Sequence, residues 1–222
     1  MEIQSLIKNI LSNIFKRNRI PPEIKILAIA LFLHGMGVRR ISKVVQSSKS
    51  SVHEWTLKFR CVLNFKVEKK RRRCIAIDES KLRVNQAWYY IYAAMDAETK
   101  ELIVMKAYTS RNYLTTLDFI KNVLKYCANK DVEIITDKMP CYEQVCRRLG
   151  IRWRHETFGR RNCIEHVFRS FKFFTMRFNH CLCVNLRKVS LRLDRNYWFK
   201  RVLYLLELWC NMFMFYWNVV RR

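Results

Sequence analysis

Residues 74–108 read CIAIDESKLRVNQAWYYIYAAMDAETKELIVMKAY, and this stretch decides the fold. It contains three runs rich in β-branched and aromatic residues, at 74–77, 87–95 and 102–108, and such runs are typical of strands. Because the runs follow one another closely, neighbouring strands are expected to pair as an antiparallel meander. The first run ends on an acid, Asp78.

The chain after this meander alternates between predicted helices and strands. Residues 112–128 and 139–149 have helical patterns, residues 132–136 and 151–155 have strand patterns, and a further helix begins near Asn162. The resulting order is βββαβαβα. This order predicts an α/β domain in which helices lie on the faces of a sheet.

The first 60 residues have helical patterns only. Pro22 suits the first position of a helix, and the apolar residues after it recur at helical spacing until Gly35 and Gly37 end the pattern. A short second helix follows, then the break Gln46-Ser47-Ser48, then a third helix near residues 49–60. This layout predicts an all-α helix-turn-helix domain over residues 1–65.

The third helix of this domain has an outer face of cations and hydroxyls. In a helix-turn-helix this helix enters the major groove, where its side chains reach base edges. The residues expected to contact DNA are therefore Lys49, Ser50, Ser51, His53 and Lys58. An ordinary three-helix bundle with a solvated face is the alternative that the pattern leaves open.

The charge of the chain indicates a polyanionic partner. Its 222 residues include 43 Lys plus Arg against 18 Asp plus Glu, a net charge of +25. Nucleic acid is the usual partner of such a charge, because Lys and Arg displace counterions from phosphates. A ribosome-type structural protein is the alternative, but 14% aromatic residues and a full hydrophobic core argue against it.

Nine cysteines invite a zinc hypothesis that their spacing does not support. The sequence has no C-x-x-C pair, and a structural zinc site needs two closely spaced ligand pairs. The odd count and the absence of a signal peptide instead predict reduced thiols in the cytoplasm, with the protein associated with the nucleoid.

Residues 197–220 are apolar enough to be considered as a membrane span. Lys200, Arg201 and Glu207 lie within the stretch, and charges inside a span are costly. We therefore expect no membrane role, and interpret residues 181–222 as a C-terminal helical segment that is buried or forms oligomers.

Residues 66–73 (KVEKKRRR) contain six cations and one acid. Such a run at a domain boundary is typical of a basic linker. It either stays solvated or holds a phosphate backbone, and the sequence leaves both open.

Three acids stand where catalytic carboxylates are expected. Asp78 and Asp137 each follow a predicted strand, and Glu165 lies near the start of a helix. If the first and fourth strands are neighbours, both aspartates lie at one edge of the sheet. Converging carboxylates repel one another unless divalent cations neutralise them, and two Mg²⁺ ions about 4 Å apart serve phosphodiester chemistry. Each acid has a structural alternative as a strand end or a helix cap.

At these residues the sequence resembles the DDE transposases of prokaryotic insertion sequences, and within them the insertion-sequence-six family. The motifs are IDESK at 77–81, AWYYIYAAMD at 87–96, ITDKMPCY at 135–142 and GRRNCIEHVFRSFK at 159–172. The resemblance implies a ribonuclease-H-like catalytic domain, here residues 74–180, with a mixed sheet flanked by helices and a helix-turn-helix before it. It implies cleavage and transfer of DNA strands at the ends of a mobile element.

The resemblance also implies the roles of particular residues. Asp78, Asp137 and Glu165 become a triad that is both catalytic and metal-binding, with Mn²⁺ able to replace Mg²⁺. Lys172 matches a basic position near the DNA phosphate, and Arg169 shares its helix face. The partners implied are double-stranded DNA, as element ends and as target, and further copies of the chain in a dimer or larger assembly.

Two features depart from the family pattern. Glu165 lies only 28 residues after Asp137, which leaves Glu156 as an alternative third acid, and the C-terminal region is unusually aromatic. Other functions also remain open: a DNA-binding regulator or inactive remnant of an element, and a metal-dependent nuclease with no joining step.

Overall fold

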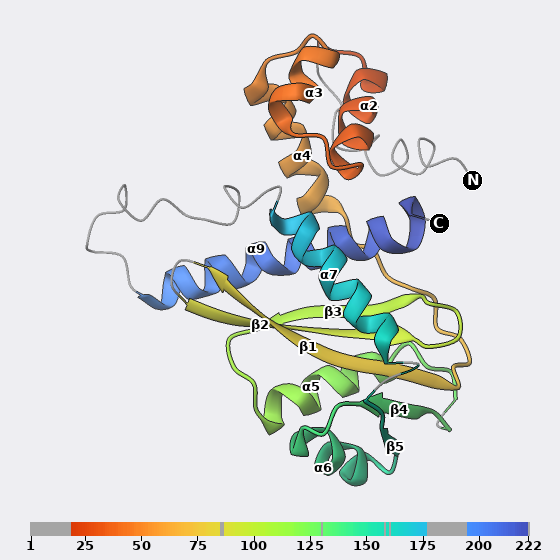
Figure 1. The fold of residues 1–222 in the computed structure, drawn as a ribbon. Helices are drawn as coiled ribbons and strands as arrows, with labels where there is room; N and C mark the ends of the chain where they lie inside the picture. The colour runs from red at the N-terminus through yellow and green to blue at the C-terminus, as the bar shows by residue number, and fades with distance from the viewer. Residues whose placement is uncertain are drawn as a thin grey trace. The chain divides into compact units, whose positions relative to one another are not determined.

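The computed structural model describes residues 19–84, 87–129, 131–157, 159, 161–176 and 195–221 (Figure 1). They form two compact units, each described here by itself. The first contains the described residues up to Phe65 together with residues 211–221, and the second contains the described residues from Lys66 to Cys210. None of the described helices is long and apolar enough to cross a membrane.

The first unit is helical, and three of its helices form where the sequence predicts them: α2 (Pro22–Leu33), α3 (Val38–Val44) and α4 (Lys49–Val62). The unit also contains the end of α9 (Arg195–Phe215) and the π turn η2 (Tyr216–Val220). The turn before α4 includes Gln46 in a left-handed conformation, with a φ of 48°. Ser48 then caps α4, because its side chain accepts a hydrogen bond from Ser51 N at 3.0 Å.

The C-terminal residues pack against the end of α4 in this unit. The rings of Phe59 and Phe65 lie 6.1 and 5.7 Å from that of Phe215, both edge to face. The Asn211 side chain accepts from Phe65 N at 3.1 Å and donates to Leu63 O, so that it satisfies the extended backbone after α4.

The second unit is built on a five-stranded sheet in the order β3-β2-β1-β4-β5. Its strands are β1 (Cys74–Val84), β2 (Ala87–Asp96), β3 (Leu102–Tyr108), β4 (Glu133–Thr136) and β5 (Arg152–His155). β1, β2 and β3 pair antiparallel as predicted, while β4 pairs parallel with both β1 and β5. The predicted α/β class, with a mixed sheet, is confirmed.

Helices lie on both faces of this sheet. α5 (Tyr113–Leu124) and α6 (Pro140–Leu149) lie on one side, and α7 (Asn162–Met176) lies on the other (Figure 1). Residues 91–96 of β2 are all buried, as expected for a strand covered on both faces. α6 ends at Gly150, whose φ of 66° suits a residue without a side chain.

β1 is longer than the sequence predicts, and this corrects the expected position of Asp78. The strand continues from Cys74 to Val84, so Asp78 lies inside it and not at its end. The parallel pairing with β4 nevertheless stops at Ala76 opposite Ile135. Beyond that point β1 pairs only with β2, which leaves its other edge open beside Asp78.

The basic run 66–73 belongs to the second unit. It was expected either to stay solvated or to hold a phosphate backbone, and Arg72 does neither. Its side chain is wholly buried, with Nη1 3.0 Å from Asp96 Oδ2 and Nη2 2.7 Å from Glu101 Oε2. Lys70 adds a contact to Glu101 at 2.8 Å. Arg72 is therefore neither solvated nor available to phosphate, and instead fixes the segment that leads into β1.

α9 is largely buried, as one interpretation of the sequence expected. Its residues up to Cys210 belong to the second unit, where the ring of Trp209 lies 5.7 Å from that of Phe174. Among the side chains of α9 that the structure describes, the exposed large apolar ones are Phe199 and Tyr204.

Candidate active site

Two of the three predicted acids meet where β1 and β4 part. Ala76 and Ile135 are the last pair between these strands, and Asp78 and Asp137 each follow two residues later. Asp78 is 7% exposed, and Asp137, which directly follows β4, is half-buried. One carboxylate oxygen of each lies within 4.8 Å of the other. From the sequence, the two aspartates were expected to meet only if the first and fourth strands were neighbours. β1 and β4 are neighbours, and their parallel pairing brings Asp78 close to Asp137.

Hydrogen bonds fix both carboxylates. Asp78 Oδ1 accepts from Glu79 N at 2.9 Å, and its Oδ2 accepts from Arg161 Nη2 at 2.9 Å. Asp137 Oδ1 accepts from Met139 N at 3.0 Å. Burial raises the pKa of Asp78 above its ordinary value, the Arg161 guanidinium opposes that shift, and the neighbouring charge of Asp137 adds to it.

Glu79 is a third acid at this point that the sequence analysis did not include. One of its oxygens lies within the same 4.8 Å as those of Asp78 and Asp137. Its carboxylate contacts Arg111 Nη2 at 2.6 Å and accepts a hydrogen bond from the Tyr142 hydroxyl. Burial raises its pKa, against the effects of Tyr142 and Arg111.

Alternation along β1 explains why Glu79 was missed. Neighbouring residues of a strand point to opposite faces, so a pair of adjacent acids is not expected to converge. The signals available were Tyr142, at the end of the quoted ITDKMPCY motif, and Arg111, just before the predicted helix. Both lie far from Glu79 in sequence, and only the fold brings them to it.

Glu165, the third predicted acid, is in the first turn of α7 but outside this group. Its side chain is 54% exposed, and its Oε1 lies 3.9 Å from Arg161 Nη1. The same guanidinium binds Asp78, so Arg161 links Glu165 to the aspartates without bringing their oxygens together. Glu156, the alternative third acid, also stays outside the group and lies 3.4 Å from Arg154.

The basic residues proposed on α7 are exposed. Arg169 and Lys172 lie one and two turns after Glu165, and both side chains face solvent. The unit as described therefore presents two cations along the helix that carries the third acid.

On α4, the predicted DNA-contacting residues differ in exposure and in their contacts with other side chains. Lys49, Ser50 and His53 are exposed. Ser51 is engaged in the cap, with its hydroxyl 2.9 Å from that of Ser48, and Lys58 lies 2.7 Å from Glu54. The first three are therefore the free candidates for base contacts.

The acid group fits a hard divalent cation. Its donors are all carboxylate oxygens, the ligands that Mg²⁺ and Mn²⁺ prefer, and they lie close enough to share an ion. A cation would also relieve the repulsion between Asp78 and Asp137.

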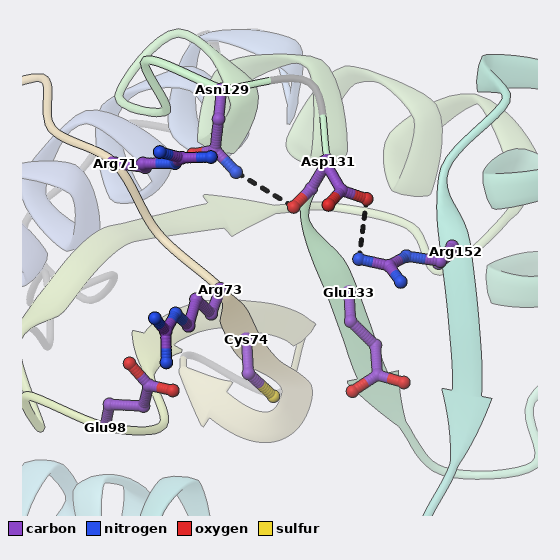
Figure 2. Close-up of a pocket in the computed structure, with 8 residues that line it drawn as sticks. All are labelled: Arg71, Arg73, Cys74, Glu98, Asn129, Asp131, Glu133 and Arg152. Atoms are coloured by element: carbon purple, nitrogen blue, oxygen red, sulfur yellow. Dashed lines mark hydrogen bonds and ion pairs between the residues drawn. The ribbon is translucent and has the colours of Figure 1, made fainter.

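A hollow lies at the opposite end of the sheet from the acid group. It measures about 660 Å³ and is lined by residues at the starts of β1 and β4 and around them: Arg71, Arg73, Cys74, Glu98, Asn129, Asp131, Glu133 and Arg152 (Figure 2). Asp131 lies 2.6 Å from Arg152, so acid and base neutralise each other there. Cations and acids alternate around this hollow, and the residues that line it do not form a cluster of carboxylates like the one at Asp78 and Asp137.

Comparison with known proteins identifies the family. The family described as a DDE domain matches residues 72–182, half of the chain. The chain is a DDE transposase of the insertion-sequence-six type. Membership confirms the resemblance drawn from the sequence, and with it a DDE-type polynucleotidyl transferase.

Relatives of this DDE transposase occur in archaea and bacteria. An uncharacterized protein of Methanocaldococcus jannaschii is 39% identical over 169 residues, which are 74% of this chain and 78% of that protein. The transposase for the element IS257 in transposon Tn4003 of Staphylococcus aureus is 25% identical over 58% of this chain, which spans 60% of that protein. Among solved structures, the catalytic core domain of BIV integrase is 14% identical, with a TM-score of 0.42 over 63% of this chain and 80% of that one.

The match covers the acids of the DDE transposase but not its N-terminal helices. It begins at Arg72, so Asp78, Asp137 and Glu165 lie within it, together with Arg169 and Lys172. The candidates on α4 lie outside it.

Proposed function

We propose that this transposase binds the ends of a mobile DNA element, cuts the strands there and joins them to a target. The observation that carries the proposal is the level placement of Asp78 and Asp137, within the residues matched by the DDE family. Their carboxylates would hold divalent cations, Mg²⁺ or Mn²⁺. When bound, the cations supply activation of an attacking oxygen and stabilisation of the leaving oxygen of a phosphodiester.

Glu165 is the proposed third ligand, in preference to Glu79. Both oxygens of Glu79 have partners, Arg111 and Tyr142, and its negative charge is balanced within the chain. Glu165 is exposed at the start of a helix, where its flexible side chain can turn toward the aspartates. Glu79 would then support the site by fixing Arg111 and Tyr142 around it.

The exposed cations would hold the DNA. Arg169 and Lys172 on α7 suit the phosphates of the strand being cut, because they follow Glu165 along one helix. Lys49, Ser50 and His53 on α4 suit base edges of the element's end. Acting on cellular DNA would place the protein in the cytoplasm, at the nucleoid.

We propose a dimer or larger assembly on DNA, since two element ends must be joined in one event. The exposed Phe199 and Tyr204 at the start of α9 are the proposed contact. Sedimentation of the DNA-bound protein should give at least a dimer. A species that stays monomeric at concentrations where strands are joined would contradict this assembly.

Purified protein, a labelled fragment of the element's end and Mg²⁺ test the function. Strand transfer products are expected. Nicked fragments without joined products would indicate a nuclease, and a retarded but uncut fragment would indicate a DNA-binding regulator or an inactive remnant.

A further inference from the structure

Arg161 contacts two of the proposed catalytic acids, Asp78 and Glu165, and the proposed reaction assigns no role to its side chain. It directly precedes α7, and its side chain is only 15% exposed. One end of its guanidinium donates to Asp78 Oδ2 at 2.9 Å, and the other lies 3.9 Å from Glu165 Oε1. Its Nε is buried and has no hydrogen-bond partner among the described residues.

This guanidinium supplies the positive charge that a metal ion would supply. Burial acts to lower the pKa of Arg161, but the carboxylates of Asp78, Asp137 and Glu165 raise it above its ordinary value. Arginine stays charged in proteins, so its cation is always present between the acids. It therefore reduces the repulsion that two close carboxylates would otherwise suffer.

The same contact limits access to Asp78. Its Oδ1 accepts from Glu79 N and its Oδ2 accepts from Arg161 Nη2, each at 2.9 Å. Both oxygens are thus engaged within the chain. A divalent cation that takes Oδ2 as a ligand competes with Arg161 for that oxygen and repels its positive charge. A guanidinium that leaves Asp78 then needs another anion, because a buried cation without a partner is costly.

We propose that Arg161 changes partners: it pairs with Asp78 and Glu165 before metal binds, and with a DNA phosphate at the site afterwards. A phosphodiester is the anion that fits, since a guanidinium binds two phosphate oxygens with two parallel N–H groups, and the Nε that lacks a partner supplies one of them. The inference rests on the proposed function, and it adds a positioning residue and a coupling between DNA and metal.

The exchange makes metal and DNA binding cooperative. Bound DNA would draw Arg161 away from Asp78 and so strengthen the metal site, and by reciprocity the metal would strengthen DNA binding. A protein without the Arg161 cation should bind metal well in the absence of DNA and gain little more when DNA is added.

Calorimetric titration with Ca²⁺ tests this without turnover. It would be run on the whole protein, alone and with a duplex of the element's end. Unmodified protein should bind Ca²⁺ about tenfold more tightly with the duplex than without it. Arg161→Gln should bind Ca²⁺ about tenfold more tightly than the unmodified protein when no DNA is present, and most of the gain from DNA should be lost.

Two further variants separate the exchange from general electrostatics and from misfolding. Arg152→Gln removes a cation that contacts Asp131 at 2.6 Å, at the opposite end of the sheet, and it should leave the coupling between DNA and Ca²⁺ intact. Arg161→Lys keeps a charge near Asp78 but cannot bridge to Glu165 in the same way, so its Ca²⁺ affinity should fall between the others. If Arg161→Gln proves unfolded by circular dichroism, this lysine variant carries the test.

Equal Ca²⁺ affinities of Arg161→Gln and unmodified protein without DNA would overturn the exchange. An equal rise for Arg152→Gln, with the coupling lost as well, would overturn it too. In both cases the proposed metal site would stand. Absence of Ca²⁺ binding to the unmodified protein, with and without DNA, would instead contradict the metal site itself and the exchange with it.

Discussion

Asp78 and Asp137 stand two residues beyond Ala76 and Ile135 respectively, the last pair that joins β1 to β4. Parallel strands in register advance together, so their side chains reach the same level at the point where the strands part. The two acids are 59 residues apart in sequence, and the strand register is what places them side by side.

The buried ion pairs of Arg72 should contribute strongly to folding. Arg72→Met removes the partner of Asp96 in the interior and should lower the free energy of unfolding by about 3–5 kcal/mol, because an unpaired buried charge remains. Urea denaturation followed by circular dichroism measures this loss. Lys58→Met, which breaks an exposed pair with Glu54, is the control and should change the unfolding curve little.

Cysteine reactivity should follow burial. Burial raises the pKa of Cys146 to about 12, so at pH 8 almost none of its thiol is the reactive thiolate. The exposed Cys61 should be alkylated by iodoacetamide under the same conditions. Peptide mass spectrometry compares the two, and labelling of Cys146 should increase as the pH rises toward 12. Equal labelling of both at pH 8 in folded protein would be inconsistent with the described core.

Recognition of the element's end should depend on α4. Lys49→Ala combined with Ser50→Ala should reduce the preference for terminal over random DNA by about tenfold, since a base contact contributes about 1–3 kcal/mol. Competition binding measures the preference. Lys121→Ala, at an exposed position of α5, removes a charge elsewhere and should leave the preference unchanged. If the double variant of α4 also keeps it, other residues read the sequence.

The third acid should be Glu165. Glu165→Gln should lose strand cleavage by orders of magnitude while DNA binding survives, because binding comes mainly from Lys and Arg. Glu156→Gln should cut nearly normally, and Glu79→Gln should show a smaller loss together with reduced stability. Cleavage of a labelled terminal fragment compares the three. Normal cutting by Glu165→Gln beside a loss in Glu156→Gln or Glu79→Gln would assign the third position to that other acid.

The order of elements was predictable because its signals are local. Strands of β-branched and aromatic residues, the Ser48 cap and the proline at the start of α6 all act within a few residues. The full length of β1 was not predictable, because SKLRV lacks a strong apolar run and forms a strand by pairing with β2. The local pattern gave no sign of this pairing.

The candidate site was predictable only in part, for a related reason. Asp78 and Asp137 follow apolar runs and could be found by their positions. Glu79 and Arg161 gain their roles from contacts across 63 and 83 residues, with Tyr142 and Asp78 respectively. No spacing in the sequence indicates such contacts. The burial of Arg72 was hidden in the same way, within a charge run expected either to stay solvated or to hold a phosphate backbone.

The most direct test of the central claim, that Asp78 and Asp137 together hold the catalytic metal, is strand cleavage by Asp137→Asn. The asparagine oxygen can still accept the hydrogen bond from Met139 N, so the fold around the site should be kept. Cleavage of a labelled terminal fragment with Mg²⁺ would be measured beside binding of the same fragment. The account predicts a loss of cleavage by orders of magnitude with binding unchanged or tighter. Near-normal cleavage by this variant would contradict it.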